Sequence, residues 1–193
     1  METVQSQFTG FKREYLWELR IPEMQLLALA WAIPEEAYGW QPAEDARSFS
    51  AALVHIAAGN LMLLYWANVH PPEVMALCES TEDNETSRSV EMVHRGQQME
   101  KSITKKPEVI DLLKRTFELV EQSFIENSED DLAVSRELFG EPTSVRKFYL
   151  RMLAHTHEHM GQVVAYARAM GFRMPWPDPI AELERKATTA AAH

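Results

Sequence analysis

The sequence has a single cysteine, Cys78, and only 7 glycines among its 193 residues. One thiol excludes an internal disulfide and any metal site built from several cysteines. This cysteine usage is compatible with a reducing compartment, and we expect a cytoplasmic protein. The scarcity of glycine, beside plentiful Leu, Met, Ala and Glu, favours helices over sheets.

The sequence also has fewer basic than acidic residues. The chain carries 19 Lys and Arg residues against 29 Asp and Glu, for a formal net charge of −10. A duplex-binding protein needs a stripe of Lys and Arg to neutralise phosphates, and we find none. Lys105 and Lys106 form a pair, with Lys101 near them. We therefore expect neither nucleic acid nor an anionic membrane as a partner. The acidic runs 79–91 and 126–131 are interpreted as solvated loops.

Long apolar runs are absent from the first half of the sequence. Its longest, residues 26–33, is too short to span a bilayer. The first 20 residues mix charges throughout and have no signal-peptide core. The length fits one domain with a substantial core, which we place at residues 1–185.

Helical spacing of apolar residues is present in four long segments, at about 8–33, 48–68, 107–126 and 143–170. Ser48 or Ser50 can cap the second helix, Pro107 opens the third and Gly171 ends the fourth. No strand with clear alternation is visible. The sequence predicts an all-α four-helix bundle with a long elaborated connection between helices 2 and 3, including an amphipathic segment at about 90–104. Residues 186–193 are expected to be a disordered tail.

In the first of these segments, Pro22 is expected either to kink the helix or to start its second part. The helical spacing there follows seven residues: Phe8, Phe11, Tyr15, Leu19, Met24, Leu27 and Trp31.

The last helix carries seven residues at spacings of three and four, so they share one stripe that faces the core. They are Val145, Phe148, Met152, His155, His159, Gln162 and Tyr166. His155 and His159 are one turn apart, and such a pair can bind a single metal ion. His157 lies off the stripe and is expected in solvent.

The second helix supplies a third candidate ligand, His55, on a stripe with Ala52, Gly59, Met62 and Trp66. Small residues beside a histidine leave room above its imidazole. Three imidazoles with an open fourth position form the pattern of a catalytic zinc site. The alternative is that all three are ordinary core histidines. Burying three unpaired imidazoles is costly, however, and one metal ion would satisfy them together.

Other site patterns are incomplete. Residues 157–159 do not have the His-Glu-x-x-His spacing of zinc proteases, and Cys78 stands in no nucleophile pattern. A di-iron carboxylate bundle needs two Glu-x-x-His motifs, and Glu91-x-x-His94 has no second copy.

Three segments resemble the DinB/YfiT-like superfamily of metal-dependent enzymes. They are Trp40-Gln41-Pro42 with Arg47-Ser48-Phe49 and Leu53-Val54-His55-Ile56, the block from His155 through His159 to Gln162, and the ending from Tyr166 to Gly171. Met160 stands where many relatives have Arg. The resemblance implies a four-helix bundle that holds zinc, nickel or iron on His55, His155 and His159.

The resemblance also implies a reaction class. Some members of the superfamily are thiol transferases that use bacillithiol or mycothiol, one is a mycothiol-dependent isomerase, and several are dimers. We therefore expect a metal-dependent transferase or hydrolase, acting on a small molecule with a low-molecular-weight thiol, and forming a homodimer. The alternative is a non-catalytic or stress-response binding protein whose metal site is structural or vestigial. Gln162 and Tyr166 would either orient the ligand or serve as core polar packing, and no catalytic residue is assigned.

Overall fold

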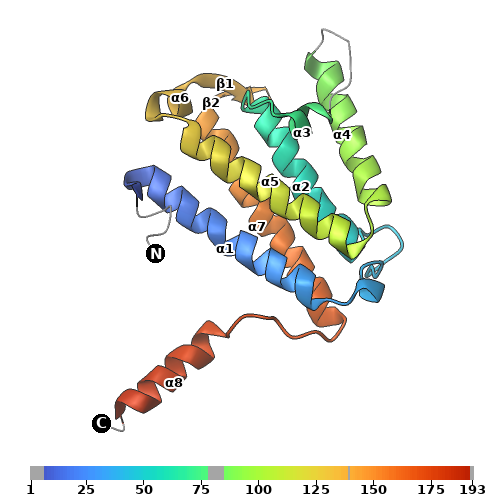
Figure 1. Ribbon diagram of the computed structural model, residues 1–193, viewed down its shortest axis with the longest axis vertical. Helices are drawn as coiled ribbons and strands as arrows, with labels where there is room; N and C mark the ends of the chain where they lie inside the picture. The colour runs from blue at the N-terminus through green and yellow to red at the C-terminus, as the bar shows by residue number, and fades with distance from the viewer. Residues whose placement is uncertain (1–6, 78–84, 139, 192–193) are drawn as a thin grey trace.

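Four long helices form the body of the molecule in the computed structural model, which describes residues 7–77, 85–138 and 140–191 (Figure 1). They are α1 (Gly10–Ala32), α2 (Phe49–Trp66), α5 (Lys106–Glu126) and α7 (Val145–Ala169). Helices α1 and α2 each pack against both α5 and α7. The predicted all-α bundle is confirmed.

Helix α2 is the central apolar helix of this bundle. Ser48 caps it as predicted, since its hydroxyl accepts a hydrogen bond from the backbone N–H of Ala51 at 3.2 Å. Among the described helices, α2 alone is long and apolar enough to cross a membrane, but 83% of its residues are buried inside the structure. That degree of burial is typical of a core helix, whose apolar surface is covered by neighbouring helices.

The connection between α2 and α5 contains α3 (Pro72–Met75) and a further long helix, α4 (Glu85–Ser102). Helix α4 packs along α2 (Figure 1), and Trp66 donates a hydrogen bond to Ser89 across this contact at 3.1 Å. The predicted amphipathic segment 90–104 is thus most of a helix that starts earlier, and the described part of the acidic run 79–91 is helical rather than a loop. Cys78 lies outside the described residues.

A short hairpin precedes α7, where the sequence showed no strand pattern. Strands β1 (Ser135–Leu138) and β2 (Glu141–Ser144) pair antiparallel, and Gly140 adopts the positive φ of 82° that their tight turn requires. Each strand has only four residues and they are mostly exposed, so no alternation of apolar residues marks them. The acidic run before them is also partly helical, because Ser128 and Asp131 form a capping box that opens α6 (Glu129–Ala133).

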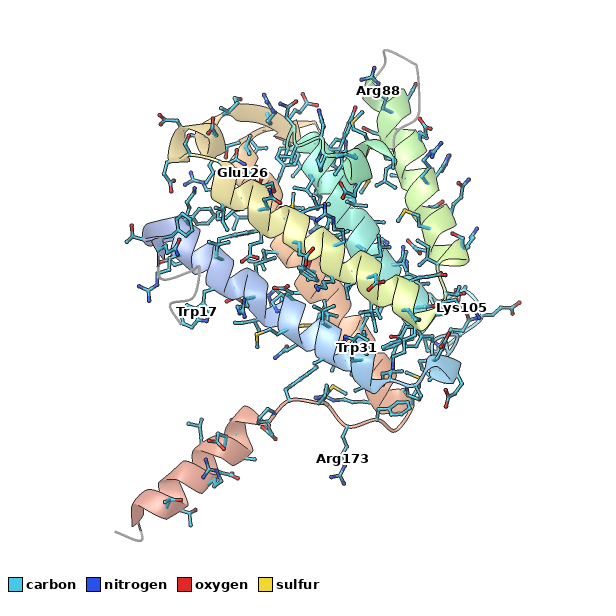
Figure 2. The ribbon with its side chains drawn as sticks, in the orientation of Figure 1. Trp17, Trp31, Arg88, Lys105, Glu126 and Arg173 are labelled. Carbon is cyan, nitrogen blue, oxygen red and sulfur yellow. The ribbon has the colours of Figure 1, made fainter. Side chains whose placement is uncertain are left out.

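The buried stripe of α1 differs from the predicted one in its second half. It runs through Pro22 at spacings of three and four, and α1 stays one continuous helix: Tyr15, Leu19, Pro22, Leu26 and Leu29 are buried. Met24 and Trp31, which the predicted spacing included, are 56% and 64% exposed, and Trp17 is 64% exposed (Figure 2). The predicted pattern failed because it stepped over Pro22 from Leu19 to Met24.

Helix α8 (Pro179–Ala191) projects away from the bundle after the proline-bearing segment (Figure 1). The structure therefore has helix as far as Ala191 where the sequence predicted a disordered tail from residue 186. The segment is rich in the strong helix formers Ala, Glu, Leu, Arg and Lys. Arg185 and Glu182 also form an ion pair of 2.7 Å within it.

An aromatic cluster ties α1, α5 and α7 together, and it generates a stability prediction. The ring of Phe124 lies 4.1 Å from that of Tyr15 and 4.9 Å from that of Tyr149, measured between centroids. Phe124→Ala should lower the free energy of unfolding by about 3–5 kcal/mol, because it leaves a cavity among buried rings. Trp17→Ala removes an exposed ring and should change the value by less than about 0.5 kcal/mol. Urea denaturation followed by circular dichroism measures both, and equal losses would contradict this account of the core.

Candidate metal centre

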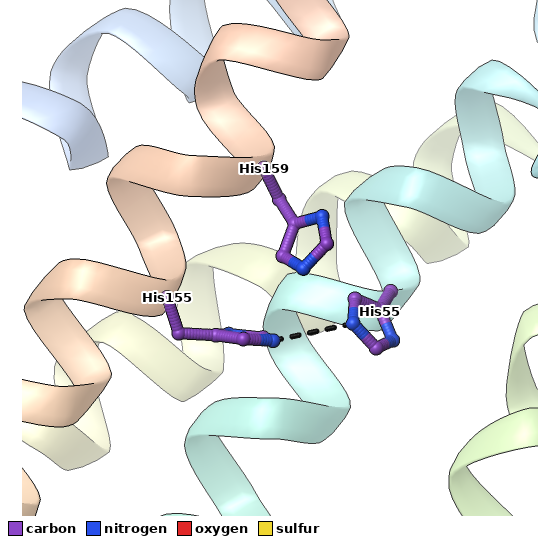
Figure 3. Close-up of side chains that lie close together, drawn as sticks. All are labelled: His55, His155 and His159. Atoms are coloured by element: carbon purple, nitrogen blue, oxygen red, sulfur yellow. Dashed lines mark hydrogen bonds between the residues drawn. The ribbon is translucent and has the colours of Figure 1, made fainter.

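Three histidines from two helices converge on one point. His55 comes from α2, and His155 and His159 come from successive turns of α7 (Figure 3). One ring nitrogen from each lies within 4.8 Å of the others, so the group could hold a metal ion. The structure thus brings together the three residues that the sequence singled out. His157 instead faces Glu18 of α1, 3.4 Å away, and is only partly exposed rather than fully solvated.

The orientation of His55 is set by a carboxylate from α4. Nδ1 of His55 lies 2.8 Å from Glu100, and the guanidinium of Arg47 donates to the other oxygen of the same carboxylate at 2.7 Å. Burial raises the pKa of Glu100, but the hydrogen bonds from His55 and Arg47 outweigh it and hold that pKa below its usual range. An ionised Glu100 can only accept, so the imidazole carries its proton on Nδ1 and presents the lone pair of Nε2.

His159 is oriented by its own helix. Its Nδ1 lies 3.0 Å from the side-chain carbonyl oxygen of Gln162, which can only accept, and the amide of Gln162 donates to the hydroxyl of Tyr166 at 2.7 Å. The proton of His159 is therefore on Nδ1, and Nε2 is left as the metal-binding nitrogen. This chain of hydrogen bonds orients a histidine, a role that neither interpretation of Gln162 and Tyr166 had named.

His155 is the most enclosed of the three. Its Nε2 lies 3.2 Å from Nε2 of His55, and its Nδ1 is buried without a hydrogen-bond partner. Burial lowers the pKa of His155 to about 3, with further lowering from the nearby His55 and His159. Burial also lowers the pKa of His159. Both rings are therefore neutral near pH 7, which is the form that binds metal.

Gly59 makes room for this arrangement. A Cβ atom at position 59 would overlap Cε1 of His155 and lie 2.8 Å from its Nδ1. The sequence placed this free space beside His55 on α2, whereas the structure fills it with the imidazole that α7 presents. Glycine inside a helix costs about 1 kcal/mol relative to alanine, and here it allows the imidazole of α7 to lie directly against the α2 backbone.

The spacing of one pair of candidate ligand atoms fits a shared divalent ion. Two imidazole nitrogens that share one tetrahedral ion at 2.0–2.1 Å lie about 3.3 Å apart. The pair from His55 and His155 is 3.2 Å apart. Without a cation, Nε2 of His155 can donate to the lone pair that His55 presents, but Nδ1 of His155 is then left as a buried acceptor without a partner.

Two cavities lie around Arg47 and Glu100. The smaller, about 150 Å³, is lined by His55, His155 and mainly apolar residues that include Met62. The larger, about 670 Å³, is lined by polar residues that include Gln162. Arg47, Gln97 and Glu100 line both. The histidine group is consequently reachable from outside the bundle, with Met62 lining the approach rather than filling it.

Glu100 is the site residue that sequence reasoning missed. It lies in the predicted amphipathic segment, but it is one of many glutamates and belongs to no motif there. Its role depends on α4 lying along α2, which the local sequence does not specify. Arg47, by contrast, already stood in one of the segments that resemble the superfamily.

Comparisons with solved structures agree on the fold. A DinB-like protein from Bacillus cereus ATCC 10987 superposes with a TM-score of 0.61 at 16% identity, covering 85% of this chain and 95% of the other. A DinB-like protein from Bacillus subtilis gives 0.59 at 17% identity, covering 83% and 93%. A mycothiol-dependent maleylpyruvate isomerase gives 0.53 at 15% identity, covering 84% of this chain and 63% of the isomerase.

The sequence itself carries the family signature. No curated protein matches the chain. The DinB superfamily pattern, however, matches residues 18–163, which include all three histidines, the glycine that accommodates His155 and the carboxylate that orients His55. Since the match spans most of the chain, this protein belongs to the DinB superfamily.

Proposed function

We propose that the protein is an enzyme that depends on a divalent metal held by His55, His155 and His159. The observation that carries this proposal is that the rings of His55 and His159 both carry their proton on Nδ1. His55 and His159 each commit Nδ1 to an oxygen acceptor of the protein, so their Nε2 atoms are the nitrogens free for a metal. Three neutral imidazoles suit zinc, nickel and ferrous iron alike, so the ligand set does not select among them.

The side chains around the ligands have defined tasks in this proposal. When bound, a divalent ion here would supply Lewis acidity and lower the pKa of a thiol or water. Glu100 holds the proton of His55, and Arg47 keeps that carboxylate ionised and in place. Gln162 holds the proton of His159 and is itself fixed by Tyr166.

For the reaction, we infer transfer or isomerisation that uses a low-molecular-weight thiol. One structural neighbour is, by its name, mycothiol-dependent. The larger cavity offers Gln41, Gln97, Lys101 and Gln162 to a hydrophilic co-substrate. The alternative of a purely structural metal is disfavoured, because structural sites are closed whereas two of these histidines line a cavity.

The first prediction from this proposal concerns metal content. Protein purified without an affinity tag should bind one zinc, nickel or ferrous ion per chain. His159→Ala should weaken binding at least about tenfold, because it removes a direct ligand. His157→Ala is the matched control, since it lies on the same helix and faces Glu18 instead. Elemental analysis and competition with a chromophoric chelator measure this, and equal affinity in both variants would overturn the three-histidine site.

The second prediction uses the close approach at Gly59. Gly59→Ala should weaken metal binding at least about tenfold, because the new methyl group displaces the imidazole of His155. Gly161→Ala is its control, since a Cβ at position 161 meets no atom within 4 Å. Both variants should remain helical by circular dichroism. Undiminished affinity in Gly59→Ala would show that His155 does not bind the metal from its present position.

The third prediction tests the thiol. Millimolar mycothiol, bacillithiol or glutathione should change the visible absorption of the cobalt-substituted protein, because a soft sulfur ligand alters the spectrum of cobalt. His155→Ala should abolish the change. A spectrum that none of the three thiols alters would refute the thiol assignment and leave the metal proposal standing, with hydrolysis the next class to test.

A further inference from the structure

The smaller cavity has an apolar wall. Its wall away from the histidines is formed by Ala58 and Met62 of α2 and by Met92, Val93 and Gly96 of α4. None of these five side chains carries a hydrogen-bonding group other than weakly accepting thioether sulfur. One side of the cavity is therefore apolar, and the other side is the candidate metal centre.

The approach of α4 to α2 defines the shape of this pocket. A Cβ at Gly96 would lie 3.4 Å from the Cβ of Ala58, so the two helices are in close contact there. The methionines lie on either helix beside this contact, Met92 buried and Met62 partly buried. Methionine is flexible and polarizable, and its sulfur makes favourable contacts with aromatic rings.

The charges that line the cavity compensate each other. Arg47 and Glu100 are its charged residues, and they form an ion pair of 2.7 Å with one another. The carboxylate is also hydrogen-bonded to His55. Among the described side chains that line the cavity, no unpaired cation is available to bind a carboxylate or phosphate, so the metal-free lining favours a neutral group.

The volume limits the size of that group. An engineered apolar cavity of about 150 Å³ binds benzene, and this cavity has a volume of about 150 Å³. We propose that the pocket between Met62 and Met92 binds a neutral apolar group of about the size of a benzene ring, beside His55 and His155. The inference deepens the proposed function, on which it rests for its catalytic meaning, by naming the substrate class as a small, uncharged, apolar molecule. Binding itself depends on the pocket walls and not on the metal.

The test compares toluene with benzoate, in which a charged carboxylate replaces the methyl group on the same ring. In metal-free protein with labelled methionine methyl groups, toluene should shift the NMR signals of Met62 and Met92 selectively, and benzoate should bind at least about tenfold more weakly, because its carboxylate would lose hydration without a partner. Val93→Asp places a charge at the rim of the pocket, where Val93 is 41% exposed, and should weaken toluene binding at least about tenfold. Val90→Asp is the matched control, since Val90 is 49% exposed on the same helix and does not line the cavity.

The outcomes separate this inference from the proposed function. Toluene shifts at Met62 and Met92 that Val93→Asp weakens and Val90→Asp preserves would support the pocket. Shifts at other methionines, equal binding of benzoate, or equal effects of the two aspartates would overturn it. Metal titration of the same samples tests the proposed function independently, because neither valine is a candidate ligand. Normal toluene binding without metal binding would refute the metal proposal alone.

Discussion

The contact between α2 and α7 at Gly59 is the constraint on which the site depends. Helix packing normally keeps backbones apart by the width of the side chains between them. Here the missing Cβ lets the ring of His155 lie against α2, one turn beyond His55. That single close approach brings ligands from two helices to one point, and the register of α7 then adds His159 one turn later.

Around this contact, each histidine is oriented by a different part of the chain. A carboxylate on α4 orients His55, and a glutamine on α7 orients His159. His155 has no partner at Nδ1 and is held by its packing and by the contact of its Nε2 with His55. Since tautomer and ring orientation are fixed by such outer contacts, α4 belongs to the centre as much as α2 and α7 do, although it supplies no histidine.

The helices and the three histidines could be predicted because residues spaced by three and four positions share one face of a helix. The stripe on α7 is uninterrupted, so His155 and His159 were placed correctly, and the small residues on α2 marked His55. On α1 the same reasoning placed Met24 and Trp31 in the core, although both are exposed. The error arose because Pro22 is itself a core residue of this helix, and proline is not usually counted as one. Glu100 could not be found this way, since its partner lies 45 residues away on another helix. The hairpin before α7 is too short to show a period.

The position of α4 has a consequence for how such a protein diversifies. Helix α4 packs against α2 and lies outside the four long helices of the core. Two of its inward residues, Met92 and Gly96, shape a cavity and touch none of the ligands through hydrogen bonds. Natural selection or a mutant library can therefore vary these two positions while Glu100, the histidines and the bundle stay constant. A lineage could reshape the cavity through a few positions of one peripheral helix, without disturbing the three histidines.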